Sequence, residues 1–333
     1  MSKDVEKNSN TKIIIASGVL FGAGALAAAT VIGLKSVASH MFKIAVVNDR
    51  ESSKKKNEEH IDVNEALEGY KDEIEASREW KRSQPFETVY IRSFDKLRLA
   101  AEFLPAQGAK GTIIMVHGYR SSAERDFACI MRDYYERGYN LLLVHQRAHG
   151  LSEGKYITYG VKESRDVTDW ARWVEGHLGE NMDIFLDGVS MGATTVLMAS
   201  GLHLPSNVRG IIADCGFTSA REIFKHVMKT KYHAPGFPVI GIADRISRKK
   251  AGFSFKECDT RKALARSRVP VLFVHGTSDE FVPVNMTIEN YEACNAAKEI
   301  LLIEEAGHAL SYFVDKEEYL RALDEFFKKY GKC

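Results

Sequence analysis

Residues 188–192 read G-V-S-M-G and follow a short apolar run, 182–186, with a segment of small and apolar residues after them. This order predicts a strand, a sharp turn that carries Ser190, and then a helix. Glycines on both sides of the serine, Gly188 and Gly192, allow a strained serine backbone and a close passage of strand and helix. The pattern indicates an exposed hydroxyl at the carboxyl end of a strand. A Gly-rich turn with a capping serine is the simpler alternative.

Two further candidate catalytic residues follow Ser190 along the chain. An apolar, strand-like run at 269–275 precedes Asp279, and another at 300–303 precedes His308. A serine, an acid and a histidine in this order, each after a strand, match the arrangement that nucleophilic acyl transfer requires.

Each of these residues also has a simpler explanation. Asp279 could be an ordinary turn aspartate, with Glu280 beside it as the acid, and His308 could cap a helix. We favour the catalytic interpretation because all three residues stand at the ends of strand-like runs in the required order.

A loop that follows another strand-like run completes the candidate site. The run spans 111–116 and is followed by H-G-Y-R at 117–120. Acyl transfer needs hydrogen-bond donors aimed at the developing oxyanion, and main-chain N–H groups beside the nucleophile and in such a loop supply them. We therefore predict an oxyanion hole made of the backbone N–H groups of Tyr119 and Met191.

With these motifs, the chain resembles the α/β-hydrolase superfamily over about residues 85–330. Residues 91–99 look like the opening hairpin of that group, and residues 145–152 resemble its Asp-x-Arg-x-x-Gly-x-Ser signature. The departure is His145, which stands where an aspartate is usual and affects a local hydrogen-bond arrangement rather than the triad.

Within the superfamily, the chain resembles the membrane-anchored hydrolases of Gram-positive bacteria that are described as serine aminopeptidase-like or Bem46-like. The supporting phrases are I-A-D-C at 212–215 and G-H-A-L-S-Y at 307–312. The resemblance implies an α/β-hydrolase fold more firmly than it implies a substrate.

The alternation of strand and helix patterns predicts an α/β domain over 85–333. Such alternation gives a mostly parallel sheet with helices on both faces, and ligands bind at the carboxyl ends of its strands. The longest stretch between core strands, about 217–268, contains prolines, aromatic residues and many lysines and arginines. We predict that it forms a small helical cap over the site.

The residues before this domain predict a membrane anchor. After a tail at 1–12, the 22 residues 13–34 are uncharged and would reach about 33 Å as a helix, enough for one transmembrane span. A cleaved signal peptide is the alternative, although its apolar region is usually shorter. Residues 35–84 are predicted to be a charged linker followed by an amphipathic helix that docks on the domain.

Composition limits the partners. The 333 residues have a formal net charge of +1, which gives no electrostatic case for nucleic acid. Five cysteines are scattered and odd in number, so they predict no disulfide framework, and Cys215 is better explained as a small buried residue than as a reactive thiol. No phosphate-binding Gly loop or zinc-type cluster is present, and we expect neither a metal nor an organic cofactor.

We therefore predict a serine hydrolase that cleaves an acyl ester or thioester of a small-molecule or lipid-like substrate through an acyl-enzyme. A serine aminopeptidase-like peptidase is the alternative within this class, and a non-catalytic binding module with a hydrolase fold is the alternative outside it. Lysines flank the predicted anchor on both sides, so their distribution gives almost no orientation, and the resemblance implies a catalytic domain outside the cytoplasm.

Overall fold

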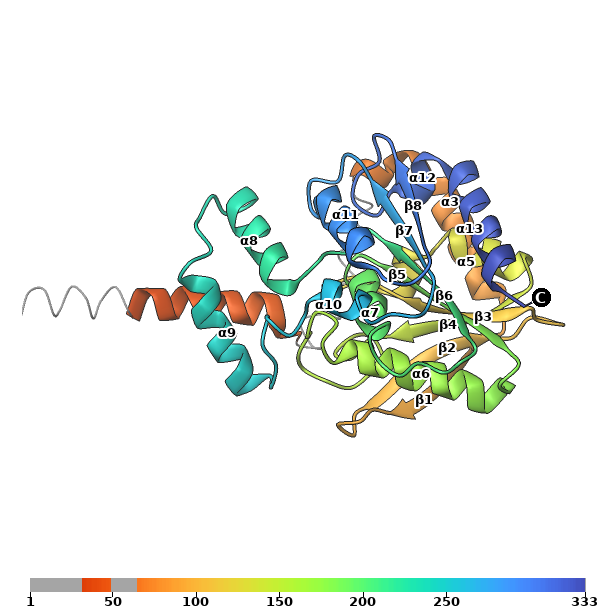
Figure 1. The fold of residues 1–333 in the computed structure, drawn as a ribbon, viewed down its shortest axis with the longest axis horizontal. Helices are drawn as coiled ribbons and strands as arrows, with labels where there is room; N and C mark the ends of the chain where they lie inside the picture. The colour runs from red at the N-terminus through yellow and green to blue at the C-terminus, as the bar shows by residue number, and fades with distance from the viewer. Residues whose placement is uncertain (1–31, 49–64, 333) are drawn as a thin grey trace, which may run out of the picture.

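The computed structural model describes residues 32–48 and 65–332. Its centre is an eight-stranded sheet in the order β1-β2-β4-β3-β5-β6-β7-β8 (Figure 1). β1 and β4 pair antiparallel with β2, and the remaining neighbours are parallel. The strands are β1 Glu87–Arg92, β2 Arg98–Leu104, β3 Gly111–Val116, β4 Tyr139–His145, β5 Asp183–Val189, β6 Val208–Asp214, β7 Val271–Gly276 and β8 Lys298–Ile303. The predicted α/β architecture with a mostly parallel sheet is confirmed.

Two helical layers cover the sheet because the central strands are apolar on both faces. In β3, Ile113 and Met115 belong to one buried cluster, whereas Ile114 and Val116 belong to the other. The first cluster lies under α3 (Lys71–Ser83), α5 (Ile130–Glu136) and α13 (Lys316–Tyr330). The second lies under α6 (Glu163–Leu178), α7 (Met191–Ala199) and α11 (Val284–Ala293). Alternation of side chains along a strand thus builds a three-layer domain.

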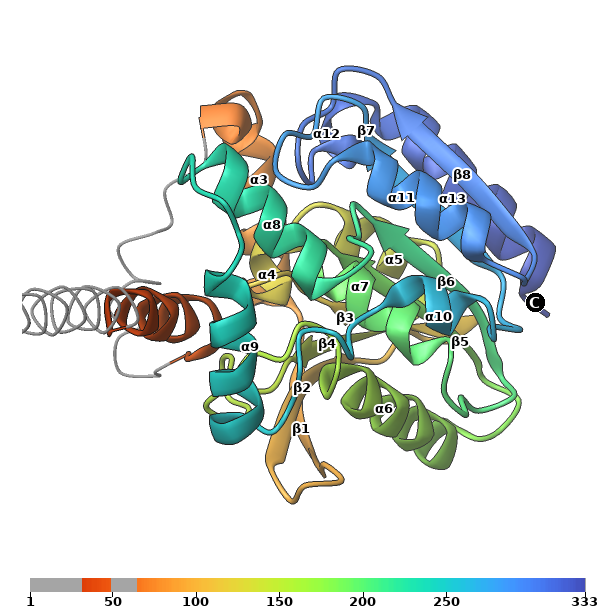
Figure 2. The same cartoon turned by 60° about the vertical axis from the view of Figure 1, so that its left-hand side comes forward.

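The region predicted as a cap contains α8 (Ala220–Thr230), α9 (Val239–Lys250) and α10 (Thr260–Leu264). Figures 1 and 2 show α8 and α9 standing away from the sheet, on the side opposite the C-terminus. α10 instead packs against α7 and α11 and is part of the body. The projecting part of the cap is therefore the α8–α9 pair.

Residues 32–46 form a helix that packs on this cap. It buries Ala38, Phe42 and Val46, which are four residues apart and line one face. These side chains join a third buried cluster, which includes Phe224 of α8 and Val239 of α9. We predicted that a charged linker starts at residue 35, whereas the structure has a packed helix up to residue 46. The prediction relied on charge composition, which does not reveal apolar residues repeated every four positions.

Most of the predicted membrane anchor, 13–34, lies outside the described residues, and only its last three residues belong to helix 32–46. Within 32–48 and 65–332, no helix combines the length and apolar character that a bilayer crossing needs.

The predicted amphipathic helix before the domain corresponds to η1 (Glu65–Tyr70) and α3, which lie on the outer layer. Ile74 is buried, and the rings of Trp80 and Tyr135 of α5 lie 5.6 Å apart. Lys81 of α3 forms an ion pair of 3.0 Å with Glu102 of β2. This helix is held on the hydrolase domain by both apolar contacts and charge.

Candidate active site

Ser190 occupies the turn between β5 and α7 with φ 56° and ψ −114°, a region that L-residues rarely adopt. A Cβ atom at Gly188 would collide with the backbone of Gly192, and one at Gly192 would collide with the carbonyl oxygen of Val116. Glycine is therefore required at both positions for strand and helix to pass this closely. The backbone N–H of Ser190 donates to the carbonyl of Asp214 at 2.8 Å and holds the turn against β6.

The structure brings Ser190, His308 and Asp279 together in one hydrogen-bonded chain. Nε2 of His308 lies 3.0 Å from Oγ of Ser190, and Nδ1 lies 2.6 Å from Oδ2 of Asp279. The three residues follow β5, β8 and β7, so the chain crosses the carboxyl ends of three strands. The imidazole side chain remains one-quarter exposed, whereas the carboxylate is fully buried.

Asp279 is held in its ionised form by its surroundings. Oδ1 accepts the backbone N–H groups of Phe281 at 2.9 Å and Val282 at 2.8 Å, and Oδ2 lies 3.2 Å from Nε2 of His275. Burial acts to raise the pKa of Asp279, but the hydrogen bonds from His275, His308 and Val282 outweigh it and hold the pKa well below its usual range. Its position as an acceptor for His308 is therefore fixed.

His275 is a functional residue that the sequence analysis missed. It is fully buried, and its Nδ1 lies 2.7 Å from the Thr287 hydroxyl while Nε2 faces Asp279 and the carbonyl of Val282. It stands in β7 directly before the turn that carries the acid. A polar residue at the end of an apolar strand was the available signal.

The loop that follows β3 lies against the nucleophile. A Cβ atom at Gly118 would be 3.4 Å from Cβ of Ser190, and the Gly118 N–H donates to Asp126 of α4 (Ala123–Asp126) at 2.6 Å. The backbone N–H groups of Tyr119 and Met191 donate to no acceptor among residues 32–48 and 65–332. Two free donors beside Ser190 are what an oxyanion hole requires.

The Tyr119 loop is fastened to the end of helix 32–46. Nη2 of Arg120 donates to the carbonyls of Ile44 at 2.9 Å and Val47 at 2.6 Å, and Nη1 donates to the side chain of Asn48 at 3.0 Å. The Tyr119 hydroxyl donates to the carbonyl of Ile44 at 3.0 Å. The last carbonyls of a helix lack partners within the helix, so these side chains cap it.

Tyr159 adds a second connection between the same segments. Its hydroxyl donates to the carbonyl of Ala45 at 2.7 Å, and its ring stacks on that of Tyr119 with centroids 5.6 Å apart. Val47 also forms an isolated antiparallel bridge with Tyr156. Residues 44–48 thus hold the loop beside the candidate site, although nothing in their sequence identifies them.

Buried histidines support the Tyr119 loop from behind. Nε2 of His149 accepts the backbone N–H of Arg120 at 3.2 Å, and Nε2 of His117 accepts that of Gln146 at 3.3 Å. Burial lowers the pKa of His117 and lowers that of His149 to about 3, so both rings are neutral at pH 7. A neutral ring can accept these hydrogen bonds, whereas a protonated ring cannot.

His145, the departure from the superfamily signature at the end of β4, is also a neutral ring. Burial lowers the pKa of His145 to about 4, and its Nε2 lies 3.8 Å from the Glu102 carboxylate. The signature arginine, Arg147, is buried and forms paired hydrogen bonds of 2.7 Å with Asp166. The departure at His145 leaves this arginine contact in place.

Cys215 lies directly behind the site. Its sulfur and the side-chain atoms of Asp279 and His308 lie within 4.8 Å of one another, the one such group of potential metal ligands in the described residues. Cys215 is fully buried, and burial raises the pKa of its thiol well above the usual value. The neutral thiol is a poor metal ligand, and its packing agrees with the interpretation as a small buried residue.

A groove leads to this site between the cap and the loop after β7. The ring of Phe281 lies 5.0 Å from that of His308, and the His226 ring in α8 contacts the carbonyl of Glu280 at 2.9 Å. The groove is lined by His226, Thr230, Lys231, Asp279, Glu280, Phe281 and Pro283. The groove therefore reaches the acid of the candidate triad, and Phe281 connects its lining to His308.

Known proteins share this architecture. Over 76% of the chain and 94% of its own length, the esterase Pf2001 of Pyrococcus furiosus superposes with a TM-score of 0.62 at 23% identity. Acylaminoacyl peptidase of Pyrococcus horikoshii superposes over 77% of the chain and 43% of its own length, with a TM-score of 0.54 at 15% identity. At these identities the likeness concerns the fold, and together with the site it defines a member of the α/β-hydrolase superfamily.

The family follows from the sequence. The prolyl oligopeptidase family matches residues 131–332, and the chain belongs to this family. The uncharacterized protein YqkD of Bacillus subtilis (strain 168) is 28% identical over 308 residues, 92% of this chain and 96% of its own. The protein is accordingly a serine hydrolase, either an esterase or a peptidase. The narrower Bem46-like resemblance stays a prediction.

Proposed function

We propose that the protein hydrolyses an acyl ester or thioester through a covalent acyl-enzyme on Ser190. The observation that carries this proposal is the hydrogen-bonded chain from Ser190 through His308 to Asp279. It is accompanied by the N–H groups of Tyr119 and Met191, which donate to no acceptor within residues 32–48 and 65–332. This combination supplies a nucleophile, a base and an electrophilic site without a metal or an organic cofactor.

The groups of the site divide the steps of the proposed reaction among them. His308 Nε2 accepts the hydroxyl proton as Ser190 attacks the acyl carbon, and the N–H groups of Tyr119 and Met191 stabilise the tetrahedral oxyanion. His308 then gives its proton to the leaving group. Water, deprotonated by His308, releases the acid and restores the serine. Asp279 orients the ring and stabilises its protonated form throughout.

Cap carboxylates favour an ester over an aminopeptidase substrate, because an amine-binding pocket needs an available carboxylate. Glu222 is engaged by Thr218 and by Arg261, and Glu257 accepts the backbone N–H of Ser254 at 2.6 Å. The peptidase alternative is supported by the family match and by Glu280 in the groove, so Glu280 is the residue that discriminates between them.

A fluorophosphonate probe tests the catalytic proposal directly. The probe should label Ser190 covalently, as seen by peptide mass spectrometry, and the Ser190→Ala variant should remain unlabelled. An intact but unlabelled wild-type protein would favour the non-catalytic binding module.

A substrate panel separates the two enzymatic alternatives. We expect turnover of p-nitrophenyl esters or lipid thioesters to exceed that of aminoacyl amides. If aminoacyl amides are preferred and Glu280→Gln removes only that activity, the protein is an aminopeptidase.

We further propose that residues 13–34 anchor the enzyme in the cell membrane with the catalytic domain outside. The length and apolar character of the segment support a span. The full chain should resist extraction from membranes by high salt and alkaline carbonate, and protease added to intact cells should cut the charged stretch 51–59. Recovery of a soluble protein beginning near Ser39 would instead show a cleaved signal peptide.

A further inference from the structure

Positive charge is concentrated in the cap. Residues 220–250 carry eight lysines and arginines and two acidic residues, a net charge of +6, whereas the whole chain carries +1. The rest of the chain is therefore at −5. The eight cationic residues are Arg221, Lys225, Lys229, Lys231, Arg245, Arg248, Lys249 and Lys250.

These cations are exposed and mostly without acidic partners. All eight are solvent-exposed, and Arg248, which contacts Asp244 at 2.8 Å, is the one that forms an ion pair within residues 32–48 and 65–332. Lysines on a solvated helix face are ordinarily interspersed with carboxylates, as on α13, where Arg321 pairs with Glu318 and Glu325. The cap departs from that pattern and attracts anions.

A hollow in the cap is lined by two of these lysines and by a histidine. It lies between α8 and the connection to α9 and is lined by Lys225, Lys229, His233, Ala234, Pro235 and Gly236. Two ammonium groups and an imidazole around one hollow match a phosphate-containing headgroup.

Aromatic side chains project from the same connection. Phe237 is 85% exposed and Tyr232 is 55% exposed, beside the lysines of α8. A phenyl ring surrounded by water is unfavourable unless it has a surface to enter, and aromatic rings with flanking lysines are typical of segments at a bilayer interface.

Helix 32–46 connects this face to the predicted anchor. It packs on the cap through Phe42, and Ile32, the first described residue, is 67% exposed. Figure 1 shows this helix on the side of the molecule opposite the C-terminus. The chain that enters at Ile32 includes the predicted span 13–34. An anchored chain would therefore hold the cap, rather than the far side of the sheet, next to the bilayer.

We propose that the α8–α9 face of the cap docks on the surface of a bilayer that contains anionic lipids. The lysines contact lipid phosphates, the hollow at Lys225 and Lys229 receives one headgroup, and Phe237 enters the interface. This inference rests on the anchoring part of the proposed function for proximity, but its charge and aromatic groups also act without an anchor. The groove beside Lys231 would then open close to the lipid surface.

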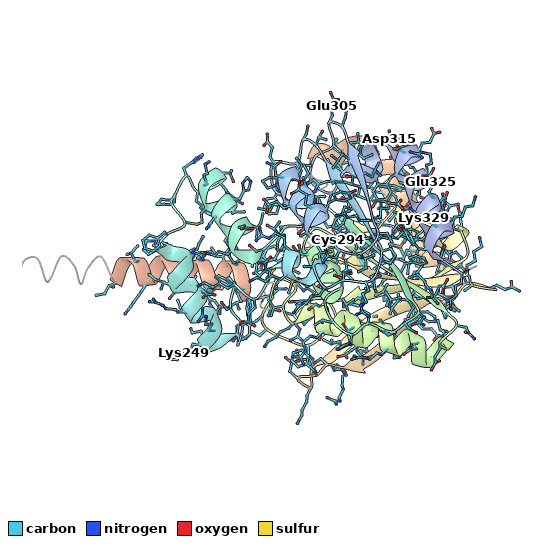
Figure 3. All side chains as sticks on the ribbon, in the orientation of Figure 1. Lys249, Cys294, Glu305, Asp315, Glu325 and Lys329 are labelled. Atoms are coloured by element: carbon cyan, nitrogen blue, oxygen red, sulfur yellow. The ribbon has the colours of Figure 1, made fainter. Side chains whose placement is uncertain are left out.

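Lysine acylation of the full chain in lipid nanodiscs tests the docking. Nanodiscs of phosphatidylcholine alone are compared with nanodiscs that also contain phosphatidylglycerol, and modification is mapped by mass spectrometry. Lys225, Lys229, Lys249 and Lys250 should react more slowly only in the anionic nanodiscs. Lys328 is the internal control, because it is exposed on α13 beside Lys329, which Figure 3 shows across the molecule from Lys249.

A charge variant provides the matched comparison. Replacing Lys225, Lys229, Lys249 and Lys250 with glutamine should abolish the protection, since each lysine near an anionic surface contributes about a fivefold change in the docked-to-free ratio. Phe237→Ser should weaken the protection of these lysines from acylation but leave the salt dependence of that protection unchanged. Hydrolysis of a soluble ester by the charge variant should be unchanged.

The outcomes are distinguishable from a failure of the proposed function. If the full chain does not co-elute with phosphatidylcholine nanodiscs, the anchor is refuted. If the fluorophosphonate does not label Ser190, the catalytic proposal is refuted. Protection of the lysines by anionic nanodiscs is measured independently of both. Equal acylation in both kinds of nanodisc overturns the docking. Stronger protection by an RNA oligonucleotide at the same ionic strength overturns it in favour of a nucleic-acid surface.

Discussion

The turn at Ser190 and the loop at Tyr119 contribute to the same site but are held by different means. Ser190 lies between two glycines, and steric exclusion within a few residues of sequence, together with β3, defines its backbone. The Tyr119 loop is held by carbonyl groups of residues 44–47, more than 70 residues earlier in the chain. The turn with the proposed nucleophile is therefore built locally, whereas the loop with the proposed oxyanion donor depends on a distant segment.

This difference has a consequence for perturbation. Changes at the turn remove the chemistry without loosening the fold, because Ser190 contributes little packing. Changes at residues 44–48 or Arg120 leave the three side chains of the proposed triad present but release the loop that positions one proposed oxyanion donor. Misplacement of such a donor weakens transition-state stabilisation more than substrate binding.

The largest effect is expected at the turn. Ser190→Ala should lower kcat by about 10³- to 10⁶-fold, because the triad acts as a unit. The melting temperature should stay near that of the wild type, since no core volume is lost. Turnover near the wild-type rate in a correctly folded variant would show that another residue is the nucleophile.

Asp279 and Glu280 are neighbours that differ in their contacts. Asp279 belongs to the hydrogen-bonded chain, whereas Glu280 lies outside it. Asp279→Asn should lower kcat by about 10²- to 10⁴-fold, because His308 loses the partner that sets its tautomer. Glu280→Gln should have a mild effect on ester hydrolysis, since its side chain is exposed at the groove. The opposite ranking would move the acid by one residue.

Truncation separates the fastening of the loop from the anchor. A chain beginning at residue 32 retains the contacts that residues 44–48 make with Tyr119 and Arg120 and should remain active on a soluble ester. A chain beginning at residue 49 loses them, and we expect kcat to fall by about 10²-fold, as for a misplacement of about 1 Å. Equal activity of the two folded chains would show that residues 44–48 do not support the site.

A point substitution tests the same contacts at smaller cost to the fold. Arg120→Lys keeps the charge but cannot reach the carbonyls of Ile44 and Val47 and the side chain of Asn48 together. We expect kcat to fall by about tenfold, with KM little changed. This loss is smaller than the roughly 10²-fold loss expected when the donor is misplaced by about 1 Å. Arg132→Lys, in an exposed pair with Glu136, is the matched control and should behave as the wild type.

Two histidines with lowered pKa values, the partly buried His145 and the buried His149, predict a pH dependence of stability. The folded-state pKa values of His145, about 4, and His149, about 3, lie below about 6.5, the value in an unfolded chain. The unfolded state therefore binds more protons as pH falls below about 6.5, and each histidine lowers the free energy of unfolding by up to about 1.4 kcal/mol per pH unit until its folded pKa is reached.

Urea unfolding between pH 8 and pH 5 measures this slope. His145→Gln should make the slope shallower, whereas His203→Gln, at an exposed position, should leave it unchanged. An unchanged slope in His145→Gln would show that folding does not lower the pKa of this ring.

The hydrolase body was predictable because its signals are local. β3 has the bounds that its apolar run predicts, and the loops that follow the strands carry Ser190, Asp279 and His308 as expected. The meeting of these three residues could be predicted from their order along the chain, because parallel strands bring their carboxyl ends to one edge of the sheet. The contribution of His275 was not recognised, because its contact with Asp279 depends on how the turn after β7 folds back.

The sequence by itself determined the α/β class, the turn at Ser190 and the uncharged run at 13–34, because each follows from periodicity or from the special geometry of glycine. Only the tertiary structure decided that residues 32–46 form part of the cap and that residues 44–48 hold the Tyr119 loop. The contacts from residues 44–47 to the Tyr119 loop are made by backbone carbonyls, which every residue possesses. No side-chain pattern in the sequence therefore predicts them. Their partners are selected by the packing of Phe42 and Val46 on the cap, which exists only in the folded chain.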